Sequence, residues 1–227
     1  MIRYTLLILN IIIFTPLFSI LVILVGLFDS KKKYTSYLSR SWAKVILFFS
    51  FVSYSIEGLD KIVLEQKYII ISNHQSFLDI LVTFSLLPLD ISFFTKKELF
   101  YIPIFGWALF LSGMISVDRF NKEKSKKSVD SALKYLKKTN LSILNYPEGT
   151  RTAFNNLSKF KKGGFILAIQ SNIPILPISI IYSENNVTNN IRLVVDDIIE
   201  TLNYNLEQRD DLIGITRTTI AKKLKIK

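Results

Sequence analysis

The sequence predicts an α/β fold, in which a mixed, largely parallel sheet with flanking helices follows an N-terminal membrane-anchoring helical pair. From residue 67 onward, short runs rich in Ile, Val and Phe alternate with longer segments of helical spacing, as in strands joined by helical crossovers. Before that point lie two uncharged stretches rich in aliphatic and aromatic residues. We therefore expect an anchoring region at residues 1–56 and a globular domain at residues 57–227.

The first uncharged stretch, residues 4–28, is long enough to cross the hydrocarbon core of a bilayer, which takes about 20 residues. Pro16 near its middle would allow a kink, and with it a re-entrant hairpin in place of a straight span. A cleaved signal peptide fits poorly, because no small-x-small cleavage site precedes Lys31–Lys33. We expect this lysine cluster, and the rest of the chain with it, to stay on the cytoplasmic side of the cell membrane.

The second uncharged stretch, residues 45–56, is too short to span a bilayer. Its aromatic residues Phe48, Phe49, Phe51 and Tyr54 favour a helix that lies in or dips into one leaflet. The alternative is a core helix of the globular domain. With residues 4–28, this stretch forms the predicted anchoring pair.

The composition narrows the class of partner. The net charge of +11, from 29 Lys and Arg against 18 Asp and Glu, suits a phospholipid surface, a phosphorylated substrate or an acidic carrier protein. A hydrophobic content of 49% favours a membrane over nucleic acid. Without cysteine the chain has neither a disulfide nor a thiolate nucleophile, and its single histidine argues against a zinc site.

The globular part is predicted element by element from its apolar spacing and its Gly and Pro breaks. Strands are expected at 68–72, 91–95, 114–117, 141–145, 175–180 and 191–195, and helices at 76–87, 104–111, 122–138, 163–171 and 208–225. Pro88 ends the first of these helices.

The only histidine, His74, lies where the strand 68–72 passes into the helix 76–87. Asp79 falls in the first turn of that helix and faces back toward the ring. A neutral imidazole there can take a proton from a hydroxyl while the carboxylate fixes its tautomer. The alternative is that Ser76 and Asp79 form a variant capping box, in which Asp79 only accepts bonds from backbone donors.

Charged or turn-forming residues also follow other predicted strands. They are Lys96 after strand 91–95, Arg119 after strand 114–117, and Glu148, Gly149, Thr150 and Arg151 after strand 141–145, while Lys161 precedes the helix 163–171. Ligands of open α/β sheets bind at the carboxyl ends of the strands, so we expect these residues to gather near His74. Arginine and lysine there suit a phosphate group.

In this order, the segments closely resemble the lysophospholipid acyltransferase family, specifically the 1-acylglycerol-3-phosphate O-acyltransferases. The matching blocks are Asn73-His74-Gln75-Ser76-Phe77-Leu78-Asp79, Gly113 through Asp118-Arg119, Tyr146-Pro147-Glu148-Gly149-Thr150-Arg151 and Ile173-Pro174-Ile175-Leu176-Pro177, together with Lys96-Lys97-Glu98-Leu99 and Phe160-Lys161-Lys162-Gly163. Small departures are Tyr146 where Phe is usual, Ser116 for an apolar residue, Phe77 for a frequent Trp and Thr152 for Ser. They leave the charged positions intact and bear on acyl-chain preference.

The resemblance implies transfer of a fatty acyl group from acyl carrier protein or coenzyme A to the sn-2 hydroxyl of lysophosphatidic acid, which makes phosphatidic acid for phospholipid biosynthesis. His74 would be the general base and Asp79 its partner. Arg119 and Arg151 would bind the phosphate. The other implied substrate-binding residues are Lys96 and Lys161 as added positive potential, Glu148 as an orienting group, and Gly149 and Thr150 in the same turn. The expected partners are the phospholipid bilayer, the acceptor and the thioester donor, with no cofactor, no metal and no nucleic acid.

Other acceptors stay open at this point: another lysophospholipid, glycerol 3-phosphate or an acylated amino acid. A function of another class is a non-catalytic membrane lipid-binding protein. The presence of both His74 and Asp79 argues against it.

Overall fold

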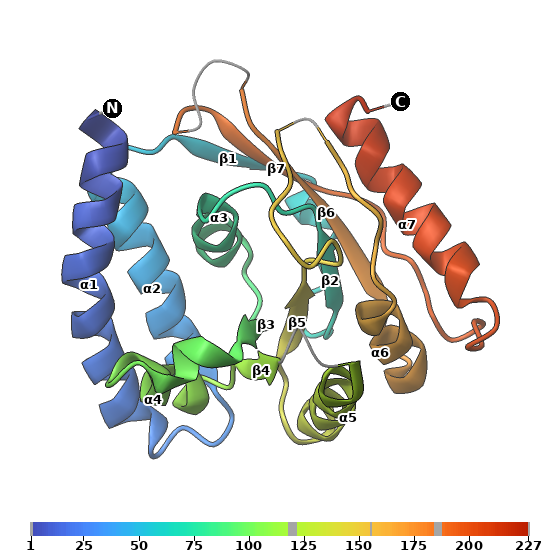
Figure 1. Ribbon diagram of the computed structural model, residues 1–227, viewed down its shortest axis with the longest axis horizontal. Helices are drawn as coiled ribbons and strands as arrows, with labels where there is room; N and C mark the ends of the chain where they lie inside the picture. The colour runs from blue at the N-terminus through green and yellow to red at the C-terminus, as the bar shows by residue number, and fades with distance from the viewer. Residues whose placement is uncertain (1, 118–121, 155, 184–187, 227) are drawn as a thin grey trace.

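A seven-stranded sheet forms the centre of the computed structural model, which describes residues 2–117, 122–154, 156–183 and 188–226, with only the backbone described at 122–128 (Figure 1). The strands are β1 Tyr54–Glu57, β2 Ile69–Ser72, β3 Ile91–Lys96, β4 Ile115–Val117, β5 Ser142–Asn145, β6 Ile175–Ile181 and β7 Ile191–Val195. The α-helices are α1 Ile2–Gly26, α2 Lys33–Phe49, α3 Leu78–Leu86, α4 Phe105–Leu111, α5 Lys122–Lys138, α6 Gly163–Ser171 and α7 Arg209–Leu224, with short 3-10 helices η1 Leu59–Lys61 and η2 Lys97–Tyr101.

The sheet is mixed and largely parallel, as the sequence predicts. Its strand order is β1-β7-β6-β2-β5-β3-β4, and the five strands from β6 to β4 are all parallel. β7 runs antiparallel to β6, and β1 runs parallel to β7. The carboxyl ends of β6, β2, β5, β3 and β4 therefore meet at one edge of the sheet, where a site is expected.

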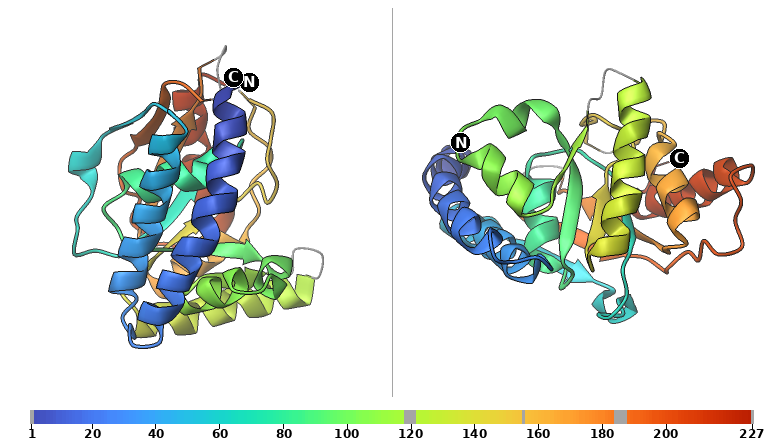
Figure 2. Two further views of the ribbon diagram at one scale, coloured as in Figure 1. Left: turned by 90° about the vertical axis from the view of Figure 1, so that its left-hand side faces the viewer. Right: turned by 90° about the horizontal axis from the view of Figure 1, so that it is seen from below.

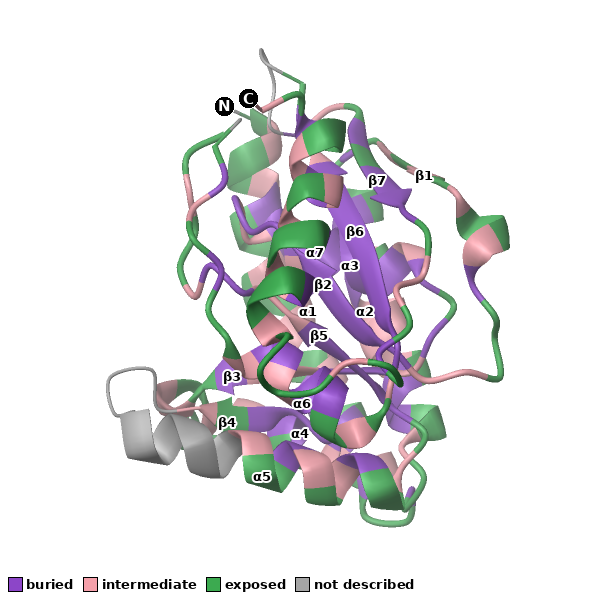
Figure 3. Cartoon of the chain, turned by 90° about the vertical axis from the view of Figure 1, so that its right-hand side faces the viewer, coloured by how far each residue is buried: buried purple, intermediate pink, exposed green. Residues whose placement is uncertain are grey.

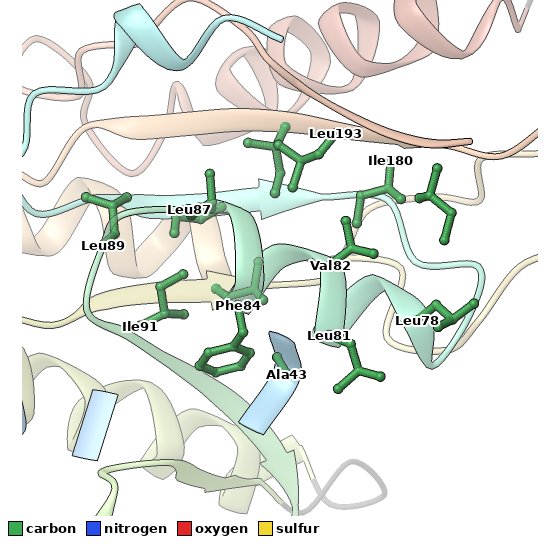
Figure 4. Close-up of a cluster of buried hydrophobic side chains, with 14 of the residues drawn as sticks. Ala43, Leu78, Leu81, Val82, Phe84, Leu87, Leu89, Ile91, Ile180 and Leu193 are labelled. Atoms are coloured by element: carbon green, nitrogen blue, oxygen red, sulfur yellow. The ribbon is translucent and has the colours of Figure 1, made fainter. Parts of the chain in front are cut away.

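Helices cover both faces of the sheet, and alternate side chains of the buried strand β2 serve the two faces. Ile70 joins a core cluster with residues of α2 and α3, whereas Ile69 and Ile71 join a second cluster with residues of α5, α6 and α7. Figure 4 shows part of the first cluster, with side chains of α3 packed between Ala43 of α2 and the sheet. Figure 3 shows the buried central strands behind the exposed outer face of α7.

The N-terminal helices α1 and α2 pack against each other, and α1 also packs against α4 (Figure 2). α1 continues as one helix through Pro16. Among the residues that the structure describes, it is the one helix long and apolar enough to cross a bilayer, judged by length and composition alone. Leu7 of α1 and Ile46 and Leu47 of α2 are nevertheless buried in the first core cluster.

The prediction of one helix across residues 45–56 is wrong. α2 begins at Lys33, where Asp29 Oδ1 accepts a bond from the Lys33 backbone N–H, and it ends at Phe49. The buried hydroxyl of Ser50 accepts a hydrogen bond from Asn10 Nδ2, and Phe51 then takes a left-handed φ of 52°, which ends the helix. The chain continues as the edge strand β1, so the second half of the stretch belongs to the sheet.

The other predicted elements are present with small differences at their ends. The segments at 122–138, 163–171 and 191–195 have the predicted bounds, and the remaining ones differ by one or two residues at either end. β1 is the strand that the sequence did not predict. The division of the chain at residue 56 stays a prediction.

Candidate active site

The loop that carries His74 leaves β2 at the carboxyl edge of the sheet. The Asn73 side chain fixes its start, because Nδ2 donates to the Ile180 carbonyl at 2.9 Å and Oδ1 accepts from the Ile180 N–H at 2.8 Å. The backbone of His74 is held on both sides. Its N–H donates to Glu148 Oε1 at 2.9 Å, and its carbonyl accepts from the Thr152 N–H at 2.9 Å. The imidazole therefore stands on a fixed support.

The His74 ring and the Asp79 carboxylate form a buried pair. His74 Nδ1 and Asp79 Oδ2 are 2.8 Å apart, and Asp79 is fully buried. The same oxygen accepts bonds from the backbone N–H groups of Gln75, at 2.7 Å, and Ser76, at 2.8 Å. Both interpretations made from the sequence thus describe one geometry: Asp79 holds the ring and also satisfies backbone donors at the start of α3.

With Nδ1 engaged by Asp79, a neutral His74 can offer the lone pair of Nε2 to a substrate. The ring lies flat against Tyr146, with centroids 4.1 Å apart and an interplanar angle of 19°. Burial, reinforced by the nearby Asp79 charge, raises the pKa of Tyr146 well above its usual value, so its hydroxyl stays protonated. Tyr146 therefore acts as a neutral wall that limits rotation of the imidazole.

Tyr182 completes the surroundings of Asp79, and the sequence reasoning missed it. Its hydroxyl donates a hydrogen bond to Asp79 Oδ1, the oxygen that His74 does not contact. Burial, followed by the charge of Asp79, raises the pKa of Tyr182, which keeps it a donor. A signal was present: Tyr182 directly follows β6, at the same sheet edge where charged residues were sought.

Glu148 stabilises the site through hydrogen bonds inside the protein. Besides the bond from the His74 N–H, its Oε2 accepts bonds from the backbone N–H of Ser158 at 2.9 Å and from the Ser158 hydroxyl at 3.1 Å. The carboxylate is buried and joins three segments: the histidine loop, the turn after β5 and the chain before α6. That this residue also orients substrate stays a prediction. Nothing in the sequence marked Ser158.

The turn after β5 presents Gly149, Thr150 and Arg151. Gly149 has a φ of 77°, and a Cβ atom there would overlap Lys161 Nζ, so the absent side chain leaves room for the lysine amine. The Gly149 N–H donates to the Tyr146 carbonyl at 3.1 Å within the turn. Thr150 and Arg151 are exposed, and the Arg151 charge is near enough to Tyr146 to oppose part of the rise in its pKa.

One further predicted residue lies toward β3. Lys96 is exposed at the end of β3, with Nζ 3.9 Å from Glu98 Oε2. Arg119 lies outside the described residues. The structure thus brings Glu148, Gly149 and Lys161 together around the support of His74, with Thr150 and Arg151 on the same turn. Among the described residues, no group of three or more His, Cys, Asp or Glu side chains could hold a metal ion.

An apolar cavity of about 290 Å³ adjoins the loop between His74 and Asp79. Phe77 of that loop is one of its walls, and the rest comes from α1, α2, α3, β3, η2 and α4 and from Ser112 and Met114, which follow α4. Residues that line it include Thr15, Phe18, Trp42, Phe84, Phe93 and Leu109. The site therefore combines a histidine–aspartate pair, exposed cations and a space suited to a hydrocarbon chain.

The sequence model of the acyltransferase family matches residues 53–181, which contain the whole histidine site. The chain belongs to this family. It is similar to the 1-acyl-sn-glycerol-3-phosphate acyltransferase of Saccharomyces cerevisiae, with 39% identity over 129 residues, 53% of this chain and 43% of the relative.

Two further relatives carry the same activity in their names. LPAT1, the chloroplastic 1-acyl-sn-glycerol-3-phosphate acyltransferase of Arabidopsis thaliana, is 33% identical over 156 residues, 68% of this chain and 43% of the relative. The enzyme of Salmonella typhimurium is 30% identical over 162 residues, 69% of this chain and 66% of the relative. The chain thus spans less than half the length of the yeast and plant relatives.

Among solved structures, the fold is similar to that of the 1-acyl-sn-glycerophosphate (LPA) acyltransferase PlsC from Thermotoga maritima. The TM-score is 0.82 at 18% identity, and the match covers 98% of this chain and 93% of the other. At this identity the likeness supports the fold. It extends to the N-terminal helices α1 and α2 as well as the sheet.

Proposed function

We propose that the chain transfers a fatty acyl group from a thioester to the sn-2 hydroxyl of 1-acylglycerol 3-phosphate and so makes phosphatidic acid for phospholipid biosynthesis. The observation that carries the proposal is the 2.8 Å contact between His74 and Asp79 beside an apolar cavity. The names of the yeast, plant and Salmonella relatives support the acceptor.

In this proposal His74 Nε2 takes the proton of the acceptor hydroxyl as its oxygen attacks the thioester carbonyl carbon. Asp79, bound at Nδ1, offsets the charge of the imidazolium that forms. The tetrahedral intermediate then expels the thiolate, which takes the proton from the imidazolium and leaves as a thiol. General-base catalysis of this kind contributes about 10²–10⁴-fold in rate. No protein side chain needs to be acylated, because the thioester is already activated.

The surroundings of the pair support the assignment of both substrates. The apolar cavity beside Phe77 suits a fatty acyl chain, since most of its lining side chains are aliphatic or aromatic and the others are Ser or Thr. Arg151 and Lys161 supply positive charge for the acceptor phosphate, and we assign Thr150 and Lys96 to the same surface. The donor is acyl carrier protein or acyl-coenzyme A, and both are compatible with the excess of positive charge.

We also infer that the protein is bound to the cell membrane with its catalytic face toward the cytoplasm. α1 carries exposed Ile and Leu side chains along its length, and Lys31–Lys33 follow it. Cations beside an apolar surface favour the anionic cytoplasmic leaflet, at about 1 kcal/mol for each Lys near the surface.

The deciding experiment assays the full chain in detergent with lysophosphatidic acid, other lysophospholipids and glycerol 3-phosphate, each with acyl carrier protein and coenzyme A thioesters. His74→Ala is expected to lower acyl transfer by at least about 10²-fold, because the base is lost. The variant should still fold, since the backbone bonds that hold the loop to Glu148 and Thr152 do not need the ring, and its unfolding temperature is measured beside that of the wild type. A folded His74→Ala protein with near-normal activity would refute His74 as the general base. A wild-type chain that is inert toward every combination of acceptor and thioester would favour a lipid-binding role.

A further inference from the structure

The outer face of α4 and η2 is apolar where a water-facing helix would be polar. Tyr101, Ile104, Trp107 and Phe110 recur at every third position, and their exposed fractions are 77%, 39%, 66% and 72%. No charged residue occurs between Glu98 and Asp118. A run of this length without charge, exposed on one helical face, is typical of a surface that meets something other than water.

The inner face of the same helix is apolar as well. Ala108 and Leu109 are buried and line the apolar cavity with Phe105. α4 is therefore hydrophobic all round and forms a thin wall, with the cavity on one side and the exposed aromatic residues on the other. A helix of this kind is normally buried or in contact with lipid.

The exposed face continues onto α1. The two helices touch at their C-terminal ends, where a Cβ atom on Gly26 would lie 2.9 Å from Leu111 Cβ. Just beyond that contact, Leu27 and Phe28 are 65% and 89% exposed. In Figure 2 (left), α1 and α4 lie on the same side of the molecule. The exposed cations Lys31 and Lys33 follow directly.

We propose that η2 and α4 form a second lipid-binding element, continuous with the outer face of α1, and that Trp107 and Phe110 enter the headgroup and acyl boundary of one leaflet. Aromatic residues at the interface and lysines beside them match the chemistry of an anionic phospholipid surface. The bilayer then lies against the outside of the cavity wall, and a lipid chain reaches the cavity with little exposure to water. This inference goes beyond the proposed function, since it concerns where lipid meets the protein and not the reaction.

Fluorescence of Trp107 tests the proposal directly, because the chain has two tryptophans and Trp42→Phe leaves Trp107 alone. The full-length variant is mixed with vesicles of phosphatidylcholine and phosphatidylglycerol that carry bromine atoms at a shallow or a deep position of the acyl chain. We expect a blue-shifted emission and stronger quenching by the shallow bromines. Unchanged emission from protein that co-sediments with the vesicles would overturn the proposal.

Variants on the two sides of the molecule provide the matched comparison. Trp107→Ser and Phe110→Ser should each weaken partition into the vesicles by roughly tenfold, because each removes a large apolar side chain from the bilayer. The controls are Leu202→Ser and Leu206→Ser, which remove exposed apolar side chains before α7, and they should leave partition unchanged. Equal losses in both pairs would refute a specific role for α4.

The competing occupant of this face is a second copy of the chain. Sedimentation of the lipid-free protein in mild detergent distinguishes it. A dimer that dissociates in Phe110→Ser, together with an absence of bromolipid quenching of Trp107, would mean that this face binds a second copy of the chain and not the bilayer. Acyl transfer to detergent-dispersed acceptor is measured on every variant. If Trp107→Ser and Phe110→Ser keep acyl transfer in detergent but lose vesicle binding, the inference is supported. An inert wild type would refute the proposed function without changing what the quenching result says about the membrane.

Discussion

At the scale of single residues, the His74–Asp79 pair is held in place by further hydrogen bonds to Asp79. Asp79 Oδ2 serves His74 and two backbone groups, and Tyr182 occupies Oδ1. The tyrosine thus withdraws negative charge from the carboxylate and fixes its plane. We infer that Tyr182 is a positioning residue for the pair.

Replacing Tyr182 with Phe should test this role, since the ring and its edge contact with Phe154 remain while the donor is lost. The carboxylate is then held less firmly, and so is the imidazole that it orients. We expect kcat to fall by roughly tenfold, as for loss of one charge-assisted bond, while the KM of both substrates stays close to the wild-type value. Phe154→Leu, which loosens the packing alone, should leave kcat close to the wild-type value. A Tyr182→Phe enzyme with wild-type kcat would end the positioning role.

Arg151 provides a residue-scale test of phosphate binding. Arg151→Ala should raise the KM for lysophosphatidic acid by about tenfold or more, because a charged hydrogen bond to the phosphate is lost, and should change the KM of the thioester less. The control is Lys159→Ala, which removes another exposed cation from the same region. Unaltered acceptor kinetics in Arg151→Ala would move the phosphate site elsewhere.

The sequence predicted the site residues that stand in local motifs, and it missed those that act over long distances. His74 and Asp79 are only five positions apart, so a short loop that leads into the first turn of α3 brings them together. Tyr182 and Ser158 reach the site only through the order of the strands. Glu148 was predicted as a residue of the site, but its bonds to His74 and Ser158 depend on how the β5 turn folds back. Local spacing does not contain that information.

At the scale of elements, the same limit explains the stretch 45–56. The stretch is uncharged and contains no Gly or Pro, so it gives no clear sign of a break, yet α2 ends at Phe49 and a strand begins at Tyr54. The break depends on Ser50, whose hydroxyl meets Asn10 of α1, and on pairing of β1 with β7. Both partners are distant in the chain. Elsewhere, as at 163–171, a periodic apolar pattern bounded by Gly and Pro was sufficient to predict where the element begins and ends.

The joint between η2 and α4 supports an element-scale prediction. A Cβ atom on Gly106 would overlap the backbone carbonyl of Phe100, so the backbone must move to accept any side chain. Gly106→Ala should lower the free energy of unfolding by about 1–3 kcal/mol and displace the wall of the cavity. Gly214→Ala is the matched change in α7, where the new methyl group meets no atom within 4 Å. It should stabilise the protein by about 0.5–1 kcal/mol. Denaturant unfolding of the two variants checks both signs, and a stabilised Gly106→Ala would contradict the packing at this joint.

At the scale of the whole molecule, the N-terminal helices and the sheet share their interior. Leu7, Ala43, Ile46 and Leu47 belong to the same core cluster as α3 and β6. α1 and α2 also form one side of the apolar cavity. A helix that is part of the fold in this way has its orientation set by the domain and not by its own hydropathy, which is why residues 4–28 alone could not distinguish a straight span from a re-entrant hairpin.

The last prediction concerns the orientation of α1. Its 25 residues extend about 37 Å, which is enough to cross a bilayer, but it lies against α2, whose exposed Lys33 and Lys44 favour water. We therefore expect both ends of α1 on the side of the catalytic domain. The chain has no cysteine, so Ile2→Cys and Ser30→Cys each give one exposed thiol, and Leu202→Cys marks the domain. In sealed vesicles with the cytoplasmic side outward, an impermeant maleimide should label all three variants. An Ile2→Cys thiol that reacts only after the vesicles are permeabilised would mean that α1 spans the bilayer and leaves its packing site on α2.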